Sequence, residues 1–79
     1  FEKENPALFY PNPAKDELNI HIENERQFKS VKVFSITGEL VHQSNIAKEK
    51  IDVSDWDSGV YLIQIEQQNN ITTNRLVVQ

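Results

Sequence analysis

Three acidic residues, Asp52, Asp55 and Asp57, are the first candidates for metal-binding chemistry in this chain. They precede Gly59, and alternating acids before a glycine resemble part of a calcium-binding loop. A complete loop of that kind has an acid or an Asn directly before the glycine and a bidentate Glu further along. Here Ser58 precedes Gly59, and no Glu follows within a loop. We therefore interpret this segment as a solvated loop and predict no metal site.

The remaining chemistry-bearing residues do not form a catalytic pattern. The chain has only two histidines, His21 and His42, and no cysteine. A zinc site built from these alone lacks ligands, because such sites use four. No serine occupies a nucleophile elbow, no pair of carboxylates marks a cleft, and two glycines cannot form a phosphate-binding loop. The sequence therefore predicts a protein that is not an enzyme and that uses no cofactor or small-molecule substrate.

Size and charge narrow the class of protein further. Seventy-nine residues make one domain, and a chain this short buries only about 60% of the surface that it exposes when unfolded. Without cysteines the core must come from apolar packing alone. The net charge of −4 and the scattered basic residues argue against nucleic acid as a partner. The chain opens at Phe1 without a Met, and we expect it to be part of a longer protein.

Short runs of alternating apolar and polar residues cover most of the chain. This period of two is typical of half-buried strands, and no segment has the period of a helix. Turn signals recur about every ten residues, as in small antiparallel sandwiches. We therefore predict an all-β fold, a small antiparallel β-sandwich of about seven short strands. The predicted strands are 18–22, 31–36, 40–43, 51–53, 60–67 and 71–78, after an entry to the sheet at 10–13 and with a polar loop at 23–29.

The same alternation predicts which side chains form the core. Two glycines mark special backbone positions: Gly38 in the turn of a hairpin, and Gly59 where a loop meets the longest strand. We expect Gly59 to adopt a φ value that other residues avoid. The predicted core residues are Leu18, Ile20, Ile22, Val31, Val33, Ile51, Val53, Tyr61, Ile63, Ile65, Leu76 and Val78.

Aromatic residues offer one alternative function, the binding of carbohydrate. Exposed aromatic side chains in a planar strip could stack on sugars, and Tyr10 and Trp56 are the candidates for exposure. Burial is the simpler account, because each ring could cover about 150–250 Å² in a small core. If Tyr10, Phe34, Trp56 and Tyr61 are buried, the carbohydrate hypothesis fails.

Four motifs occur in a fixed order along the chain. Each is common by itself, but together they form a specific pattern that ends on an apolar strand at Gln79. The motifs are Tyr10-Pro11-Asn12-Pro13; Val31-Lys32-Val33-Phe34-Ser35-Ile36-Thr37-Gly38-Glu39-Leu40-Val41; Gly59-Val60-Tyr61-Leu62-Ile63; and Arg75-Leu76-Val77-Val78.

In this order and spacing, the motifs resemble the type A C-terminal sorting domain of the type IX (Por) secretion system of Bacteroidetes. The resemblance implies a seven-stranded Ig-like sandwich that carries its parent protein from the periplasm across the outer membrane to the cell surface or the medium. It also implies recognition by the translocon and shuttle proteins of the outer membrane and removal by a sortase. Residues 1–8 would be a linker from the upstream cargo protein, and residues 9–79 the sorting domain.

The resemblance also implies which residues carry the signal. A basic residue opens the last motif, usually Lys in the family and Arg75 here, and an arginine does not replace a lysine in every setting. We expect an edge or strand that a partner engages by strand addition. The alternatives are a carbohydrate-binding or adhesion module and an inert stabilising domain. The expected signal residues are Gly59, Val60, Tyr61, Arg75, Leu76, Val77, Val78 and Gln79, supported by the motif residues Tyr10, Pro11, Asn12, Pro13 and Gly38.

Overall fold

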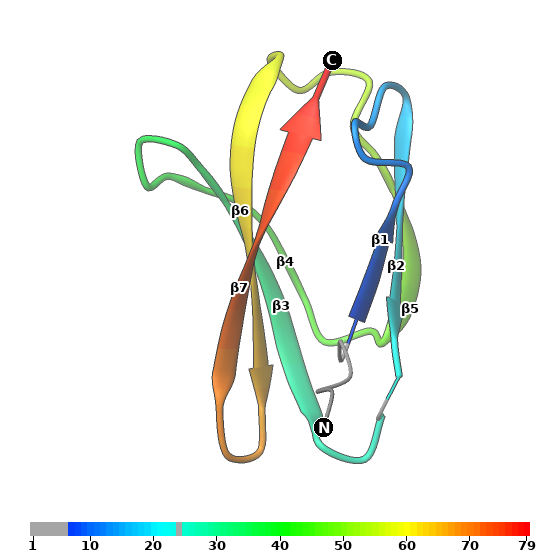
Figure 1. Ribbon diagram of the computed structural model, residues 1–79, viewed down its shortest axis with the longest axis vertical. Coiled ribbons are helices and arrows are strands. Elements are labelled where there is room, and N and C mark those ends of the chain that lie inside the picture. The colour runs from blue at the N-terminus through cyan, green and yellow to red at the C-terminus, as the bar shows by residue number, and fades with distance from the viewer. Residues whose placement is uncertain (1–6, 24) are drawn as a thin grey trace, which may run out of the picture.

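Seven strands in two sheets form the described part of the protein (Figure 1). The structure is a computed structural model and describes residues 7–23 and 25–79. These ranges contain no helix, and so none that could span a membrane. The strands are β1 (Ala7–Tyr10), β2 (Glu17–Ile22), β3 (Phe28–Ser35), β4 (Leu40–Ser44), β5 (Lys48–Asp52), β6 (Gly59–Gln67) and β7 (Ile71–Val78).

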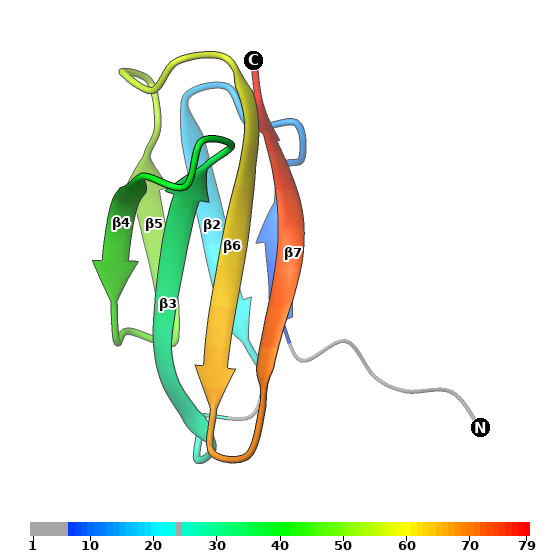
Figure 2. The same cartoon turned by 90° about the vertical axis from the view of Figure 1, so that its left-hand side faces the viewer.

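The strands pair into a smaller sheet, in the order β1-β2-β5, and a larger sheet, in the order β4-β3-β6-β7. Every pairing between these strands is antiparallel. Figure 2 views the larger sheet from its outer side, with the smaller sheet behind it. The prediction of an all-β antiparallel sandwich with about seven strands is confirmed.

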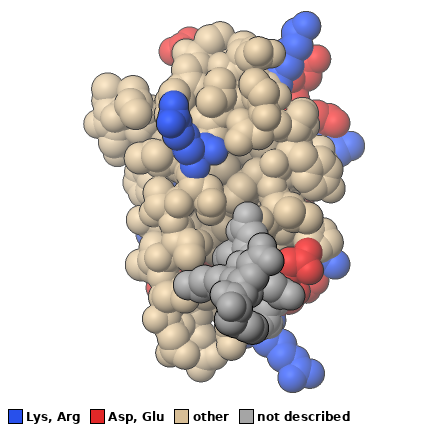
Figure 3. All heavy atoms as spheres, viewed as in Figure 1, with Lys and Arg blue, Asp and Glu red and all other residues tan. Residues whose placement is uncertain are grey.

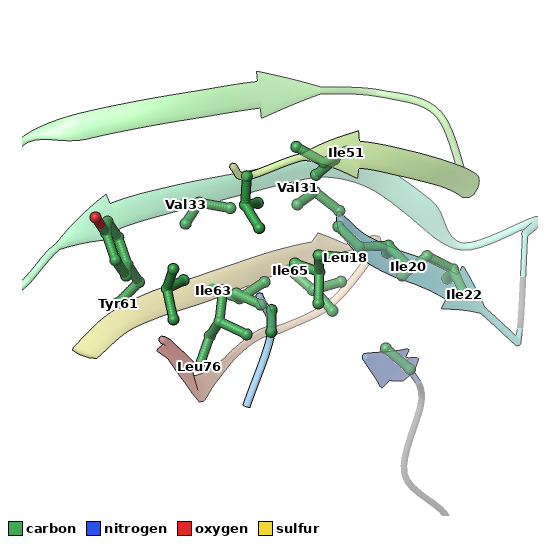
Figure 4. Close-up of a cluster of buried hydrophobic side chains, with 14 residues drawn as sticks. Leu18, Ile20, Ile22, Val31, Val33, Ile51, Tyr61, Ile63, Ile65 and Leu76 are labelled. Atoms are coloured by element: carbon green, nitrogen blue, oxygen red, sulfur yellow. The ribbon is translucent and has the colours of Figure 1, made fainter. Parts of the chain in front are cut away.

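The core lies between the two sheets and is built from every second residue of the facing strands (Figure 4). On β6, Tyr61 and Ile63 are buried, whereas Leu62 between them is exposed. This follows from the strand geometry, which points successive side chains to opposite faces. All the predicted core residues are buried, and the structure adds Ala7 and Ala14 to them.

The hairpin between β3 and β4 turns at Gly38, as predicted. The backbone N–H of Ser35 donates to the carbonyl of Glu39 at 2.8 Å, and the N–H of Gly38 donates to the carbonyl of Ser35 at 2.9 Å. Gly38 has a φ of +95°, a conformation that favours glycine. Ile36, which we assigned to the strand, lies instead in this turn and is 68% exposed.

Two strands begin earlier than predicted, because polar residues hide their pattern. β3 begins at Phe28, inside the segment 23–29 that we predicted to be a loop, and the Phe28 ring packs against the core. β5 begins at Lys48 rather than at residue 51. There Glu49 faces β4, where it accepts a hydrogen bond from the Ser44 hydroxyl at 2.5 Å. A carboxylate at an inward position breaks the apolar alternation on which the prediction rested.

The sandwich also begins before residue 9, which we predicted to be its first residue. Ala7 lies in β1 opposite Ile22 and is fully buried, and Leu8 lies opposite His21. A residue of the core belongs to the folded domain, so the boundary between linker and sandwich lies at or before Ala7. The rest of the predicted linker, residues 1–6, lies outside the described residues.

Candidate recognition site

Three of the motif segments meet at one end of the sandwich. The start of β6 lies beside the end of β7, with Gly59 opposite Val78 and Tyr61 opposite Leu76. The segment that follows β1 runs along the other side of β7, through Asn12 and Ala14. Figure 1 shows these segments together at the end of the molecule that holds the end of β7. Residues that are far apart in sequence therefore form one structural unit.

The side chain of Asn12 binds the backbone of β7 with both of its polar groups. Its Oδ1 accepts a hydrogen bond from the N–H of Val77 at 3.1 Å, and its Nδ2 donates to the carbonyl of Arg75 at 3.2 Å. A carboxamide has one acceptor and one donor side. It can therefore take the place of one residue of a neighbouring strand, which explains why Asn stands between the two prolines of this motif.

Ala14 continues the contact with backbone hydrogen bonds. Its N–H donates to the carbonyl of Val77 at 2.8 Å, and its carbonyl accepts from the N–H of Gln79 at 2.8 Å. These bonds form an isolated parallel bridge between Ala14 and Val78. The Ala14 side chain is fully buried, so a larger residue would not fit without rearrangement. The sequence gives no sign of this role, because a single alanine after a proline carries no pattern.

The contacts of Asn12 and Ala14 narrow one expectation. We expected an edge or strand that a partner engages by strand addition, and at the end of β7 four backbone groups on the outer edge already have partners. They are the carbonyl of Arg75, the N–H and carbonyl of Val77, and the N–H of Gln79. In the folded domain, a partner cannot pair with the backbone of this part of β7. Its side chains remain available for recognition.

The side chains at the end of β7 divide between the core and the surface. Leu76 and Val78 point inward and are buried, whereas Arg75 is exposed. Among the described residues, no carboxylate lies within 4.0 Å of the Arg75 guanidinium. Of the residues expected to carry the signal, Leu76 and Val78 are thus scaffold, while Arg75 presents a free positive charge to solvent.

Tyr61 joins β6 to the loop before it. The ring is 7% exposed and packs against Trp56, with ring centroids 5.1 Å apart. Its hydroxyl donates to the carbonyl of Asp57 at 2.7 Å. Burial, and secondarily the Asp57 carboxylate, raise the pKa of Tyr61 above its usual value of 10.0. The folded state thus favours the neutral phenol, and this contribution is complete below pH ~10 and is lost as the pH rises through the higher folded pKa.

Gly59 adopts a φ of +148°, as predicted for the residue at which the loop meets β6. We expect Gly59→Val to lower the free energy of unfolding by about 1–3 kcal/mol, because L side chains rarely adopt this backbone conformation. No atom lies within 4 Å of the position that a Cβ would take. The cost is therefore backbone strain and not a clash.

Urea unfolding checks this prediction, with Ser58→Val as the control. Ser58 is the exposed neighbour of Gly59, so its replacement is expected to change the free energy of unfolding by under about 0.5 kcal/mol. Equal stability of the two variants would show that φ at Gly59 relaxes freely.

The aromatic residues do not form a common surface for sugars. Tyr61 is buried, and Trp56 packs against the core. Tyr10, which we expected to be buried, is 51% exposed and lies on β1 of the smaller sheet. Phe34 is half-buried on β3 of the larger sheet. The two more accessible rings thus belong to different sheets, which argues against a planar strip for carbohydrate.

Of the acidic residues near Gly59, Asp52 is used within its own turn. The carboxylate of Asp52 accepts hydrogen bonds from the hydroxyl and the backbone N–H of Ser54, at 2.6 and 2.9 Å. These bonds, the one from the hydroxyl first, lower the pKa of Asp52. Within residues 7–23 and 25–79, no three metal-binding side chains gather at one place. His21 and His42 each lie near one glutamate, at 3.3 and 3.2 Å.

Comparison with known proteins gives likenesses of three kinds. Among curated proteins, beta-agarase D of Zobellia galactanivorans is 29% identical over 69 residues, which are 87% of this chain and 14% of the agarase. Among solved structures, PorZ of Porphyromonas gingivalis, described as an essential surface component of its type-IX secretion system, has a TM-score of 0.72 at 22% identity. That match covers 92% of this chain and 11% of PorZ. The chain thus spans a small part of each of these proteins.

The third likeness is to a family model. The model described as "Secretion system C-terminal sorting domain" matches residues 8–79. This range includes all four motifs, the Asn12 contacts and six complete strands. The solved structure shares the two-sheet fold. Because the match extends over almost the entire sandwich, this chain belongs to the family of type IX secretion system C-terminal sorting domains.

Proposed function

We propose that the secretion machinery recognises this sorting domain as a folded unit while it directs an attached protein across the outer membrane. The observation that carries the proposal is the contact between Asn12 and β7. Asn12 lies 63 residues before Arg75 and 65 before Val77, so these residues meet only when the sandwich has formed. An unfolded signal could not present the motifs side by side.

The route that we propose has three steps. The attached protein reaches the periplasm, the outer-membrane translocon and its shuttle proteins bind the folded domain, and the attached protein arrives at the cell surface or in the medium. A sortase then removes the domain. Because Ala7 is a buried residue of β1, a cut that leaves the sandwich intact lies before Ala7.

We further propose that the domain has no catalytic role. Two of the carboxylates that could support catalysis are engaged in structural contacts: the Asp52 carboxylate holds a turn, and Glu49 binds Ser44 and His42. The activity of the complete protein then resides in its other parts. Beta-agarase D, which shares this domain at 29% identity, is an example of a named enzyme with such a segment.

A reporter fusion tests the proposal. Residues 1–79 fused to the end of a periplasmic reporter are expected to carry it to the surface of a bacterium that has the type IX machinery. The reporter without the domain should stay in the periplasm, and so should the fusion in a strain that lacks the machinery. The ratio of surface to periplasmic reporter measures the result. A fusion that remains in the periplasm of the competent strain would contradict the proposed function.

A further inference from the structure

The outer face of the larger sheet is apolar in one half. Phe34 on β3 lies opposite Leu40 on β4 and opposite Leu62 on β6. Leu62 in turn lies opposite Arg75 on β7. Since Val33 and Ile63 point into the core, their neighbours Phe34 and Leu62 point to the outside. Three apolar side chains and one arginine thus form a continuous row across all four strands.

A second apolar row lies beside the first. Val60 on β6 is opposite Val77 on β7, and Ile36 from the β3–β4 turn lines the same shallow notch as Val60. On the other side, the next row is polar: Lys32 is opposite Gln43 and Gln64, and Gln64 is opposite Thr73. The two apolar rows form the apolar patch, which consists of Phe34, Ile36, Leu40, Val60, Leu62 and Val77.

Half of the apolar patch is exposed, namely Ile36, Leu40 and Leu62, and the other three residues are half-buried. Leu40 and Leu62 are 47% and 36% exposed. The partly buried apolar residues that pack against the core are Phe9, Phe28, Ala47 and Trp56, and none of them belongs to the patch. A contiguous exposed apolar surface with a polar border is typical of a protein interaction site.

The outer face of the smaller sheet has a different character. Lys50 and Glu17 form an ion pair there at 3.8 Å, and Lys48 pairs with Glu25 at 3.3 Å. In Figure 3, most of the charged side chains in view lie on the side of β2 and β5, and one basic side chain stands out on the side of β6 and β7. The two ion pairs thus lie on the smaller sheet, whereas the apolar patch occupies one half of the outer face of the larger sheet.

We propose that the apolar patch and Arg75 form the docking surface for a protein of the secretion machinery, whose matching surface is apolar with a carboxylate opposite Arg75. This inference rests on the proposed function and assigns it to one face of the domain. The Arg75 guanidinium at the end of the Phe34–Leu62 row, which has no carboxylate partner within residues 7–23 and 25–79, supplies the charge complementarity. Arginine is enriched among the residues that dominate binding energy at protein interfaces.

Two other occupants fit less well. A second copy of the domain would bring its own patch, so that two arginines without carboxylate partners would enter one interface. A lipid surface with anionic head groups would be repelled by the net charge of −4. A carboxylate on a partner protein would form an ion pair with Arg75, and the six residues of the apolar patch would exclude water from the interface.

The test replaces one leucine on each outer face of the sandwich in the reporter fusion. Leu62→Gln places a polar group at the centre of the patch, and Leu8→Gln is the matched control, because Leu8 is 48% exposed on the smaller sheet. We expect Leu62→Gln to lower the surface-to-periplasm ratio about tenfold at limiting expression, and Leu8→Gln to leave it unchanged. Both melting temperatures should stay within about 4 °C of the unchanged domain.

A competition experiment separates recognition from later steps of transport. The domain without a reporter, co-expressed in the periplasm, should reduce export of the unchanged fusion, and the Leu62→Gln domain should not. The Arg75→Lys fusion should keep export within about twofold of the unchanged fusion, because a positive charge remains. The Arg75→Glu fusion should lower export about tenfold, because it places a negative charge against the partner's carboxylate.

Several results would overturn this assignment. One is export of the Leu62→Gln fusion at the same level as the unchanged fusion. This result would refute the docking surface but leave the proposed function intact. A dimer of the domain in sedimentation experiments that Leu62→Gln abolishes would show that a second copy occupies the patch. Binding to phosphatidylglycerol vesicles that Leu62→Gln abolishes would show that a lipid surface occupies it. Failure of the unchanged fusion itself would instead refute the proposed function.

Discussion

Deletion of Arg75–Gln79 is expected to leave a chain that does not fold. The deletion removes Leu76 and Val78 from the core, and each buried aliphatic side chain contributes about 1.5–3 kcal/mol. It also removes the backbone partners of Ala14 and of the start of β6. A domain of 79 residues has a free energy of unfolding of only about 4–12 kcal/mol. We therefore expect no cooperative thermal transition by circular dichroism and no dispersed amide signals by NMR.

Arg75→Ala is the control for this deletion. It removes the exposed basic group and leaves Leu76 and Val78 in place, so its melting temperature should match that of the unchanged domain. Lost export of the Arg75→Ala fusion then indicates recognition, whereas lost export of the truncated fusion indicates unfolding. A truncated domain that melts cooperatively would show that the contacts of β7 beyond Asn74 are dispensable.

The core and the bounds of most strands follow from the sequence because alternation is a strong signal. β2 and β6 have apolar residues at every second position, and β7 has them at Leu76 and Val78. These three strands were predicted to within one residue at each end. The start of β5 was not predicted correctly, because Glu49 faces β4 and binds Ser44 there. An inward carboxylate is recognisable only when its partner on another strand is known.

The candidate recognition site could be anticipated as a set of motifs but not as an arrangement. The motifs name Asn12 and the residues at the end of β7, yet a pattern of residue types does not say that the Asn12 carboxamide closes the outer edge of that strand. The apolar patch escaped prediction for a related reason. Phe34, Leu40 and Leu62 become neighbours only through the pairing register of β3 with β4 and β6.

A pair of substitutions on β6 tests the two faces of the larger sheet. Ile63→Ala is expected to lower the free energy of unfolding by about 2–5 kcal/mol, because Ile63 is fully buried and its removal leaves a cavity. Leu62→Ala, one residue earlier and 36% exposed, should lower it by less than about 1 kcal/mol. Urea unfolding of the two purified variants provides the measurement. A large loss from Leu62→Ala would show that Leu62 supports the core, and the docking surface would then lose its central residue.

The same pair separates stability from recognition in the reporter fusion. Ile63→Ala removes no exposed group, so any export that it loses should return at a lower growth temperature, where more of the domain is folded. Leu62→Ala leaves the fold intact, so the export that it loses should not return on cooling. This difference arises because the alternation of β6 places a core residue and a docking residue next to each other in the chain. Recovery of both variants on cooling would mean that the outer face of the sheet contributes only stability.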